Sequence, residues 1–177
     1  MWAIKGVFAM LIKILLVTGS SSDRWIIKEA LKDYSVLTAC DGLEATDILN
    51  ENDSVNLLIL DLDSPNINAG QVLEFIKKDE RFRNMRILAL TNGHKLDDEI
   101  KALKLCTLDY IRKPINMDLL KARIGAHVAI LCMEQRLQEQ LRRQKLSFDM
   151  IIDQAPIGIA IAYSCDSNDF NEETVRI

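Results

Sequence analysis

The chain has 177 residues, of which 49% are hydrophobic and 27% are charged, a length that suits one domain and a shorter remainder. The 22 Lys and Arg residues against 26 Asp and Glu residues give a formal charge of -4, which argues against binding of a phosphate backbone, so we expect no nucleic-acid partner. The four cysteines lack metal-ligand spacing and are too few for a disulfide scaffold. We therefore expect a reducing, cytoplasmic location.

Residues 1–12 form a mostly apolar stretch, which we interpret as an N-terminal extension with Met10 as its natural start. The uninterrupted apolar run is much shorter than the roughly 20 residues that cross a bilayer, so we expect no membrane contact.

Five aliphatic segments then alternate with amphipathic helical segments. Asp41 and Asn68 are residues of the kind that cap a helix N-terminus, and Asp41 with Glu44 predicts a capping box. Strict alternation implies an α/β fold, a doubly wound parallel sheet with helices on both faces. The predicted strands are 12–17, 36–39, 56–60, 86–90 and 108–111, and the last helix before the fifth strand is expected near 96–103.

An extended C-terminal helix is predicted over residues 117–150, because no proline interrupts the pattern after Pro114 until Pro156. One apolar face steps by four and three residues, the spacing of a coiled coil, which predicts a dimeric helical linker and hence a homodimer. This seam consists of Leu137, Leu141, Gln144, Phe148 and Ile151, and it extends backwards, imperfectly, through Leu120, His127 and Ile130.

Three polar residues follow three of the predicted strands. Asp61 ends the third strand, Thr91 the fourth, and Lys113 with Pro114 the fifth. The carboxyl ends of parallel strands share one edge of a sheet, so a carboxylate, a hydroxyl and an ammonium are expected to meet there. An aspartate can attack a phosphoryl group while the cation and hydroxyl stabilise its oxygens, and this set therefore suits phosphoryl transfer to Asp61.

These residues, in this order and spacing, resemble the receiver domains of two-component response regulators over residues 13–123. The resemblance implies the flavodoxin-like strand order 2-1-3-4-5 and a histidine kinase or other phosphodonor as partner. It also implies a phosphorelay role without enzymatic activity in this fragment. By the same resemblance Asp61 is the phosphoacceptor, Thr91 and Tyr110 are the switch residues, Lys113 senses the phosphate, and Pro114 follows a cis peptide bond.

One departure from the receiver pattern is specific. Receivers carry an acidic pair after the first strand to hold Mg²⁺, and the aligned residues here are Thr18 and Gly19. Mg²⁺ requires oxygen ligands and offsets the charge between two anions, so binding is expected to be weak. Asp61 with Asp63 could supply a residual metal site, and Asp23 lies close enough in sequence to contribute.

Alternatives remain open from the sequence alone. Asp61 is phosphorylated and switches the domain, or the domain is a pseudo-receiver that serves as a constitutive dimerisation or docking module. A more remote alternative is an FMN-binding flavodoxin-like protein, because residues 18–22 form a hydroxyl-rich loop at a helix start. Residues 151–177 resemble the beginning of a PAS sensor domain. That resemblance implies a downstream output such as a diguanylate cyclase, a phosphodiesterase or a histidine kinase.

Overall fold

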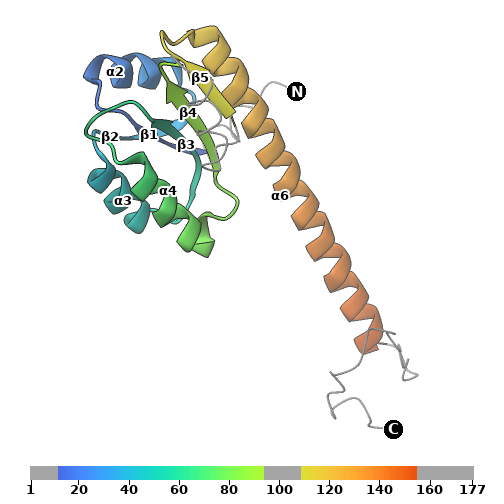
Figure 1. The fold of residues 1–177 in the computed structure, drawn as a ribbon. Helices are drawn as coiled ribbons and strands as arrows, with labels where there is room; N and C mark the ends of the chain where they lie inside the picture. The colour runs from blue at the N-terminus through green and yellow to red at the C-terminus, as the bar shows by residue number, and fades with distance from the viewer. Residues whose placement is uncertain (1–11, 94–108, 155–177) are drawn as a thin grey trace. The chain divides into compact units, whose positions relative to one another are not determined.

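The computed structural model describes residues 12–93 and 109–154. Within these ranges five parallel strands alternate with helices, and α6 is a single long helix (Figure 1). The elements are β1 (Lys13–Val17), α2 (Ser21–Ala30), β2 (Ser35–Ala39), α3 (Gly42–Glu51), β3 (Val55–Asp61), α4 (Ala69–Lys78), the 3₁₀ turn η1 (Glu80–Phe82), β4 (Arg86–Thr91), β5 (Asp109–Arg112) and α6 (Met117–Gln154).

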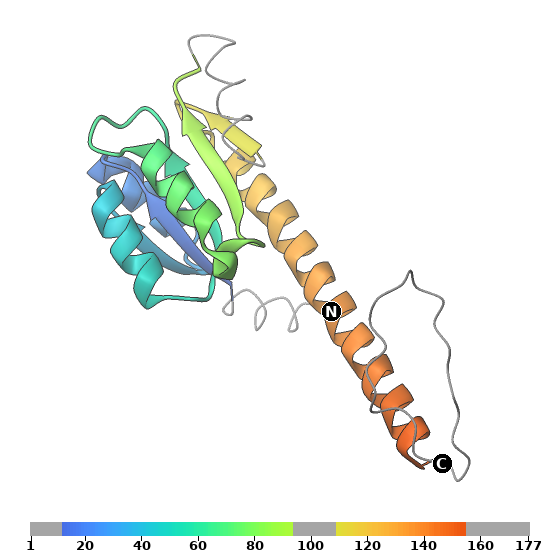
Figure 2. The ribbon, with the colours of Figure 1, turned by 60° about the horizontal axis from the view of Figure 1, so that its bottom comes forward.

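The strand order is β2-β1-β3-β4-β5 and every pairing is parallel, which confirms the predicted sheet. Helices α3 and α4 cover one face of this sheet, as the rotated view makes clear (Figure 2). Helix α2 and the beginning of α6 cover the other face. The helix expected near residues 96–103 lies outside the described residues, as do residues 1–11 and the segment 155–177.

The core is aliphatic and lies on both faces of the central strands. The side chains of β1 from Ile14 to Val17 and of β3 from Leu57 to Leu60 are fully buried. Each such Leu or Ile contributes about 1.5–3 kcal/mol by leaving water, which explains why these runs do not alternate with polar residues. Ile12, where the predicted extension and the predicted first strand overlap, is also buried, and its carbonyl accepts a hydrogen bond from the Ser35 N–H.

Local capping follows the sequence closely. Asn68 accepts a hydrogen bond from the Gln71 N–H at the start of α4, and Asp41 accepts one from the Glu44 N–H at the start of α3. Glu44 reaches back to the N–H of Cys40, one residue before the position that a capping box uses. These caps satisfy amide groups that the first helical turn leaves without partners.

Helix α6 is attached to the sheet through its first four turns. Leu120, Ile124 and Leu131 are buried on that side, and so is His127. Asp109 at the start of β5 pairs with Arg123, and its other carboxylate oxygen lies 3.4 Å from the His127 Nε2. Leu120 and His127 therefore pack within the same chain, and the predicted backward extension of the coiled-coil seam through them is wrong.

The contacts divide the chain into two units after Leu131. Within the described part of the chain, no helix is both long enough and apolar enough to pass through a membrane.

Candidate functional site at the carboxyl edge of the sheet

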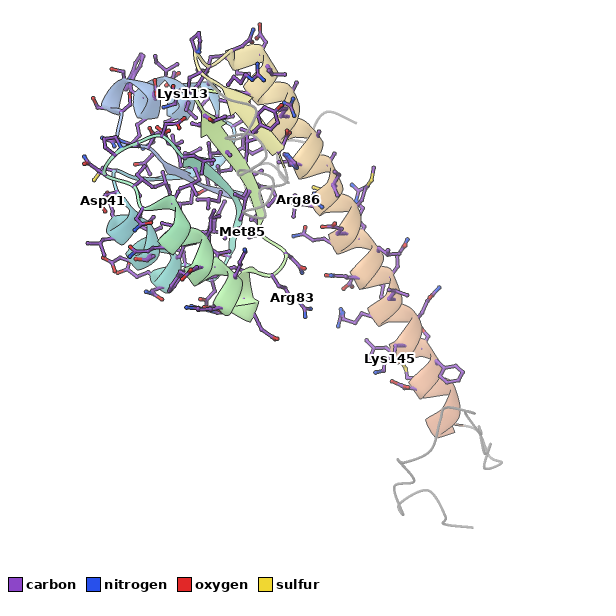
Figure 3. The ribbon with its side chains drawn as sticks, in the orientation of Figure 1. Asp41, Arg83, Met85, Arg86, Lys113 and Lys145 are labelled. Carbon is purple, nitrogen blue, oxygen red and sulfur yellow. The ribbon has the colours of Figure 1, made fainter. Side chains whose placement is uncertain are left out.

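Four residues at or just after the ends of four strands lie at one edge of the sheet. Thr18 follows β1, Asp61 and Thr91 are the last residues of β3 and β4, and Lys113 follows β5. The Lys113 N–H donates to the Thr91 carbonyl over 2.8 Å, so the two neighbouring strand ends are joined by their main chains. In the side-chain view Lys113 marks this edge, and Arg86 marks the opposite end of β4 (Figure 3).

The Asp61 carboxylate is buried and receives two side-chain donors on the same oxygen. The Thr18 hydroxyl donates to Oδ2 over 2.8 Å, and the Lys113 ammonium lies 2.6 Å from the same atom. Its other oxygen, Oδ1, accepts the Asp63 N–H at 3.3 Å. Both oxygens are thus hydrogen-bonded, which compensates for removing a charged group from water.

Lys113 is shared between two carboxylates. Besides Asp61 it lies 3.4 Å from Asp23 Oδ2, in the first turn of α2. Burial by itself would lower the pKa of the Lys113 ammonium, but the hydrogen bond and charge of Asp61, followed by those of Asp23, raise it. The ammonium is therefore a fixed positive charge at the site. The peptide bond between Lys113 and Pro114 is cis, as the resemblance implies.

The residues at the acidic-pair positions have a definite structure. Thr18 is buried, its N–H donates to the Ala39 carbonyl, and its own carbonyl accepts a 2.7 Å hydrogen bond from Arg24. A Cβ added at Gly19 would lie 2.4 Å from the Ser64 hydroxyl oxygen. The loop is thus built around a hydroxyl at one position and the absence of a side chain at the other.

The side chains present do not fit a magnesium site. Thr18, in place of a carboxylate, donates its hydroxyl proton to Asp61, and the Lys113 ammonium contacts the same carboxylate oxygen. Asp63 accepts a hydrogen bond from the Asn92 N–H. Across residues 12–93 and 109–154, no three His, Cys, Asp or Glu residues are grouped so that they could hold a metal ion. A hydroxyl and one buried carboxylate form a poor donor set for an ion that prefers six oxygens.

The two switch candidates have separate environments. Thr91 is buried, and its hydroxyl oxygen accepts the Gly93 N–H at 3.2 Å. Gly93 has φ of 59°, a left-handed conformation that suits glycine, and a Cβ there would crowd Arg112. Tyr110 is half-buried in β5, where it pairs with Ala89 of β4.

The structure therefore brings Asp61, Lys113 and Thr18 into contact, and it places Thr91 on the adjacent strand end. Sequence reasoning treated Thr18 as a missing acid or as part of a phosphate-binding loop, and it placed Asp23 near the cleft as a metal ligand. It did not find the hydrogen bond from Thr18 to Asp61, the pairing of Asp23 with Lys113, or the role of Ser64. Asp23 and Lys113 both lie where elements meet the carboxyl edge, so the topology carried a signal for their pairing. Ser64 is recognisable only from the close approach of its side chain to Gly19.

Comparisons with known proteins agree with this geometry. A family model described as the response regulator receiver domain matches residues 14–125. A chemotaxis protein CheY homolog of Campylobacter jejuni is 33% identical over 115 residues, which cover 63% of this chain and 88% of that protein. Chemotaxis protein CheY1 of Helicobacter pylori is also 33% identical over 115 residues, covering 63% of this chain and 93% of that protein.

Solved structures give the same result. The crystal structure of a response regulator receiver domain protein from Clostridium thermocellum has a TM-score of 0.61 and 30% identity, and the match covers 70% of this chain and 98% of that chain. These matches favour a receiver over a flavodoxin. Since the family model spans more than half of the sequence, the chain belongs to the response regulator receiver family, a family of two-component signalling modules.

Proposed function

We propose that this receiver domain is a pseudo-receiver, a constitutive docking and dimerisation module whose Asp61 does not accept a phosphoryl group with the help of Mg²⁺. The observation that carries the proposal is the 2.8 Å hydrogen bond from the Thr18 hydroxyl to Asp61 Oδ2. The donor of that hydrogen bond, Thr18, stands at one of the two positions where receivers carry a metal-binding acid.

The charge balance supports this proposal. Attack of Asp61 on a phosphoryl group brings two anions together, and a divalent cation normally offsets their repulsion. Among the described residues, the cation in contact with Asp61 is the ammonium of Lys113, and its charge already faces both Asp61 and Asp23. Adding a phosphoryl group would therefore create a net negative site in a largely buried position, which is unfavourable.

A second candidate is a phosphorylated receiver that accepts its phosphoryl group from a histidine kinase. The 2.6 Å contact between Lys113 and Asp61 favours it, because it holds a cation where a phosphoryl group on Asp61 would also be within reach. In this alternative, Thr91 and Tyr110 would move inward when Asp61 is phosphorylated. Mg²⁺ would bind weakly through Asp61 and Asp63.

Intact mass after incubation with acetyl phosphate and Mg²⁺ distinguishes the two candidates. The proposal expects no phosphoryl adduct on the wild-type chain, and the Asp61→Asn variant controls for adducts elsewhere. The positive control is a variant carrying Thr18→Asp and Gly19→Asp, with Ser64→Ala to make room for the new side chain at residue 19. An adduct on the wild type that is absent from Asp61→Asn would refute the pseudo-receiver.

We also infer that the domain acts on the segment C-terminal to it. The long helix α6 would hold two copies together and pass their geometry to residues 151–177, which resemble the start of a PAS domain. An output such as a diguanylate cyclase, a phosphodiesterase or a histidine kinase would then respond to the dimer. Where the gene encodes an output domain after these residues, assaying that output with and without residues 12–131 tests this relay, because an unchanged output would oppose it.

A further inference from the structure

Helix α6 has two apolar faces. One packs within the chain through Leu120, Ile124 and Leu131. The other face, which we call the outer stripe, is left exposed by the structure, and its large apolar members are between 41% and 68% exposed. The outer stripe consists of Leu119, Ala122, Ala126, Ile130, Met133, Leu137, Leu141, Gln144 and Phe148.

The outer stripe repeats every 11 residues. Leu119, Ile130 and Leu141 form one series, and two further series occupy the positions three and seven residues after each of them. Eleven residues make about three α-helical turns, so all three series stay on one face. The spacing is regular from Leu119 to Phe148, whereas the heptad seam predicted from the sequence needs Leu120 and His127, which are buried.

Charge does not oppose a second helix along this stripe. None of its nine members is ionisable. Glu139, Arg142 and Arg143 fall on the opposite face by helical spacing, and Glu139 pairs with both arginines over 2.9 Å. Arg123, at the edge of the stripe, pairs with Asp109. These charged side chains are paired within the chain, and the stripe itself carries no charge.

We propose that the outer stripe binds the same stripe of a second copy of this chain, parallel and in register. A parallel pair places Gln144 opposite its counterpart, where the two amides can hydrogen-bond, whereas an antiparallel pair centred on the same stripe would set Gln144 against Ala122. The interface begins inside the receiver domain, at Leu119. Its 11-residue period gives a nearly straight or right-handed pair of helices, unlike a left-handed heptad coil.

This inference rests on the proposed dimeric linker, and sedimentation equilibrium of the full chain tests it. The wild type is expected to be a dimer, and Ala126→Arg is expected to weaken dimerisation by about tenfold or more, since it sets a charge in the stripe. Ala126 is exposed, so the substitution leaves the core intact. Leu137→Lys is a second variant with the same expected effect, and Gln135→Arg, away from the stripe, is the matched control.

Two results would overturn the interface. A wild-type chain that stays monomeric would remove it, and wild-type dimerisation of Ala126→Arg would exclude Ala126 from the contact between the two chains. The phosphoryl mass measurement is independent of both results. A phosphorylated dimer would therefore refute only the proposal that Asp61 stays unphosphorylated. An unphosphorylated monomer would refute the proposed dimerisation and its interface, and it would leave the proposal for Asp61 intact.

Orientation is tested by disulfide trapping in a full chain whose native cysteines are replaced by serine. Leu141→Cys is expected to cross-link with its counterpart on mild oxidation, since parallel register sets the two thiols face to face. Leu146→Cys is the control, because this exposed residue lies on the opposite side of the helix. Equal cross-linking of both variants, or none at residue 141, would contradict the parallel arrangement.

Discussion

Thr18 stabilises the Asp61 carboxylate directly, whereas an acid in the same position would not. A carboxylate next to Asp61 would repel it unless a cation lay between them, whereas a hydroxyl donates a hydrogen bond directly. With the 2.8 Å hydrogen bond from Thr18 and the ammonium of Lys113, the Asp61 carboxylate has a donor and a counter-charge without a metal ion. The accompanying glycine fits the same plan, because the Ser64 hydroxyl lies where its Cβ would be.

Replacing Thr18 tests this hydrogen bond. Thr18→Val keeps the shape of the side chain but removes the donor from a buried carboxylate, so it is expected to lower the free energy of unfolding by about 1.5–3 kcal/mol. Thr18→Ser is the control, because it keeps the hydroxyl and therefore the hydrogen bond to Asp61. Urea denaturation measures both variants, and equal stability of Thr18→Val and Thr18→Ser would argue against the contact.

The ion pair between Lys113 and Asp61 is tested by a double-mutant cycle. Lys113→Met leaves the buried Asp61 without its cation, so we expect a loss of about 3 kcal/mol in the free energy of unfolding. Asp61→Asn in the same chain removes the unpaired charge and should restore part of the loss. Strictly additive effects of the two substitutions would mean that the pair is not coupled.

At the scale of elements, the attachment of α6 to β5 depends on an acid. Burial by itself would raise the pKa of Asp109, but the hydrogen bond from Arg123, the Tyr110 N–H and the Arg123 charge outweigh it and lower the pKa. A carboxyl whose pKa is lower in the folded state stabilises the fold above its unfolded value. That contribution is lost as the pH falls through the folded pKa.

Asp109→Asn should therefore reduce the free energy of unfolding near neutral pH and flatten its decline below about pH 4. Urea denaturation of the wild type and the variant at a series of pH values measures both effects. Wild-type and variant curves that run parallel down to acid pH would show that this carboxylate does not contribute.

Helix and strand positions were largely readable from the sequence, because capping residues and aliphatic runs are local signals. Asn68 and Asp41 accept the predicted amide hydrogen bonds, and all five strands occur in the predicted order. The seam on α6 was not readable in the same way. Periodicity reveals two apolar faces, but it does not say which one the chain's own sheet covers, and Leu120 proved to face inward.

At the scale of the whole molecule, topology explains why the site residues could be predicted. A parallel sheet brings the ends of β3, β4 and β5 to one edge, so Asp61, Thr91 and Lys113 were expected together from strand order alone. Contacts between individual atoms were beyond that reasoning. The hydrogen bond from Thr18 depends on the exact approach of β1 to β3, and the pairing of Lys113 with Asp23 depends on the position of α2.

Stability should depend on protein concentration if two chains associate through the outer stripe. Mass action favours the folded dimer as concentration rises, so the melting temperature of the wild type is expected to increase between dilute and concentrated samples. Ala126→Arg should largely lose this dependence. Circular dichroism at several concentrations measures it, and a melting temperature that is independent of concentration in the wild type would contradict association.

Amide NMR spectra of the ¹⁵N-labelled chain, recorded during titration with Mg²⁺ and then beryllofluoride, show whether Asp61 is held by Thr18 and Lys113 without a metal ion. Beryllofluoride mimics an acyl phosphate on an aspartate that has a metal ion beside it. If Asp61 binds no metal ion, the amide signals of Asp61, Thr91 and Lys113 do not move in the wild type. Those signals should move in the variant with Thr18→Asp, Gly19→Asp and Ser64→Ala. Saturable shifts of the same signals in the wild type would mean that Asp61 binds the metal ion and that the domain is not a pseudo-receiver.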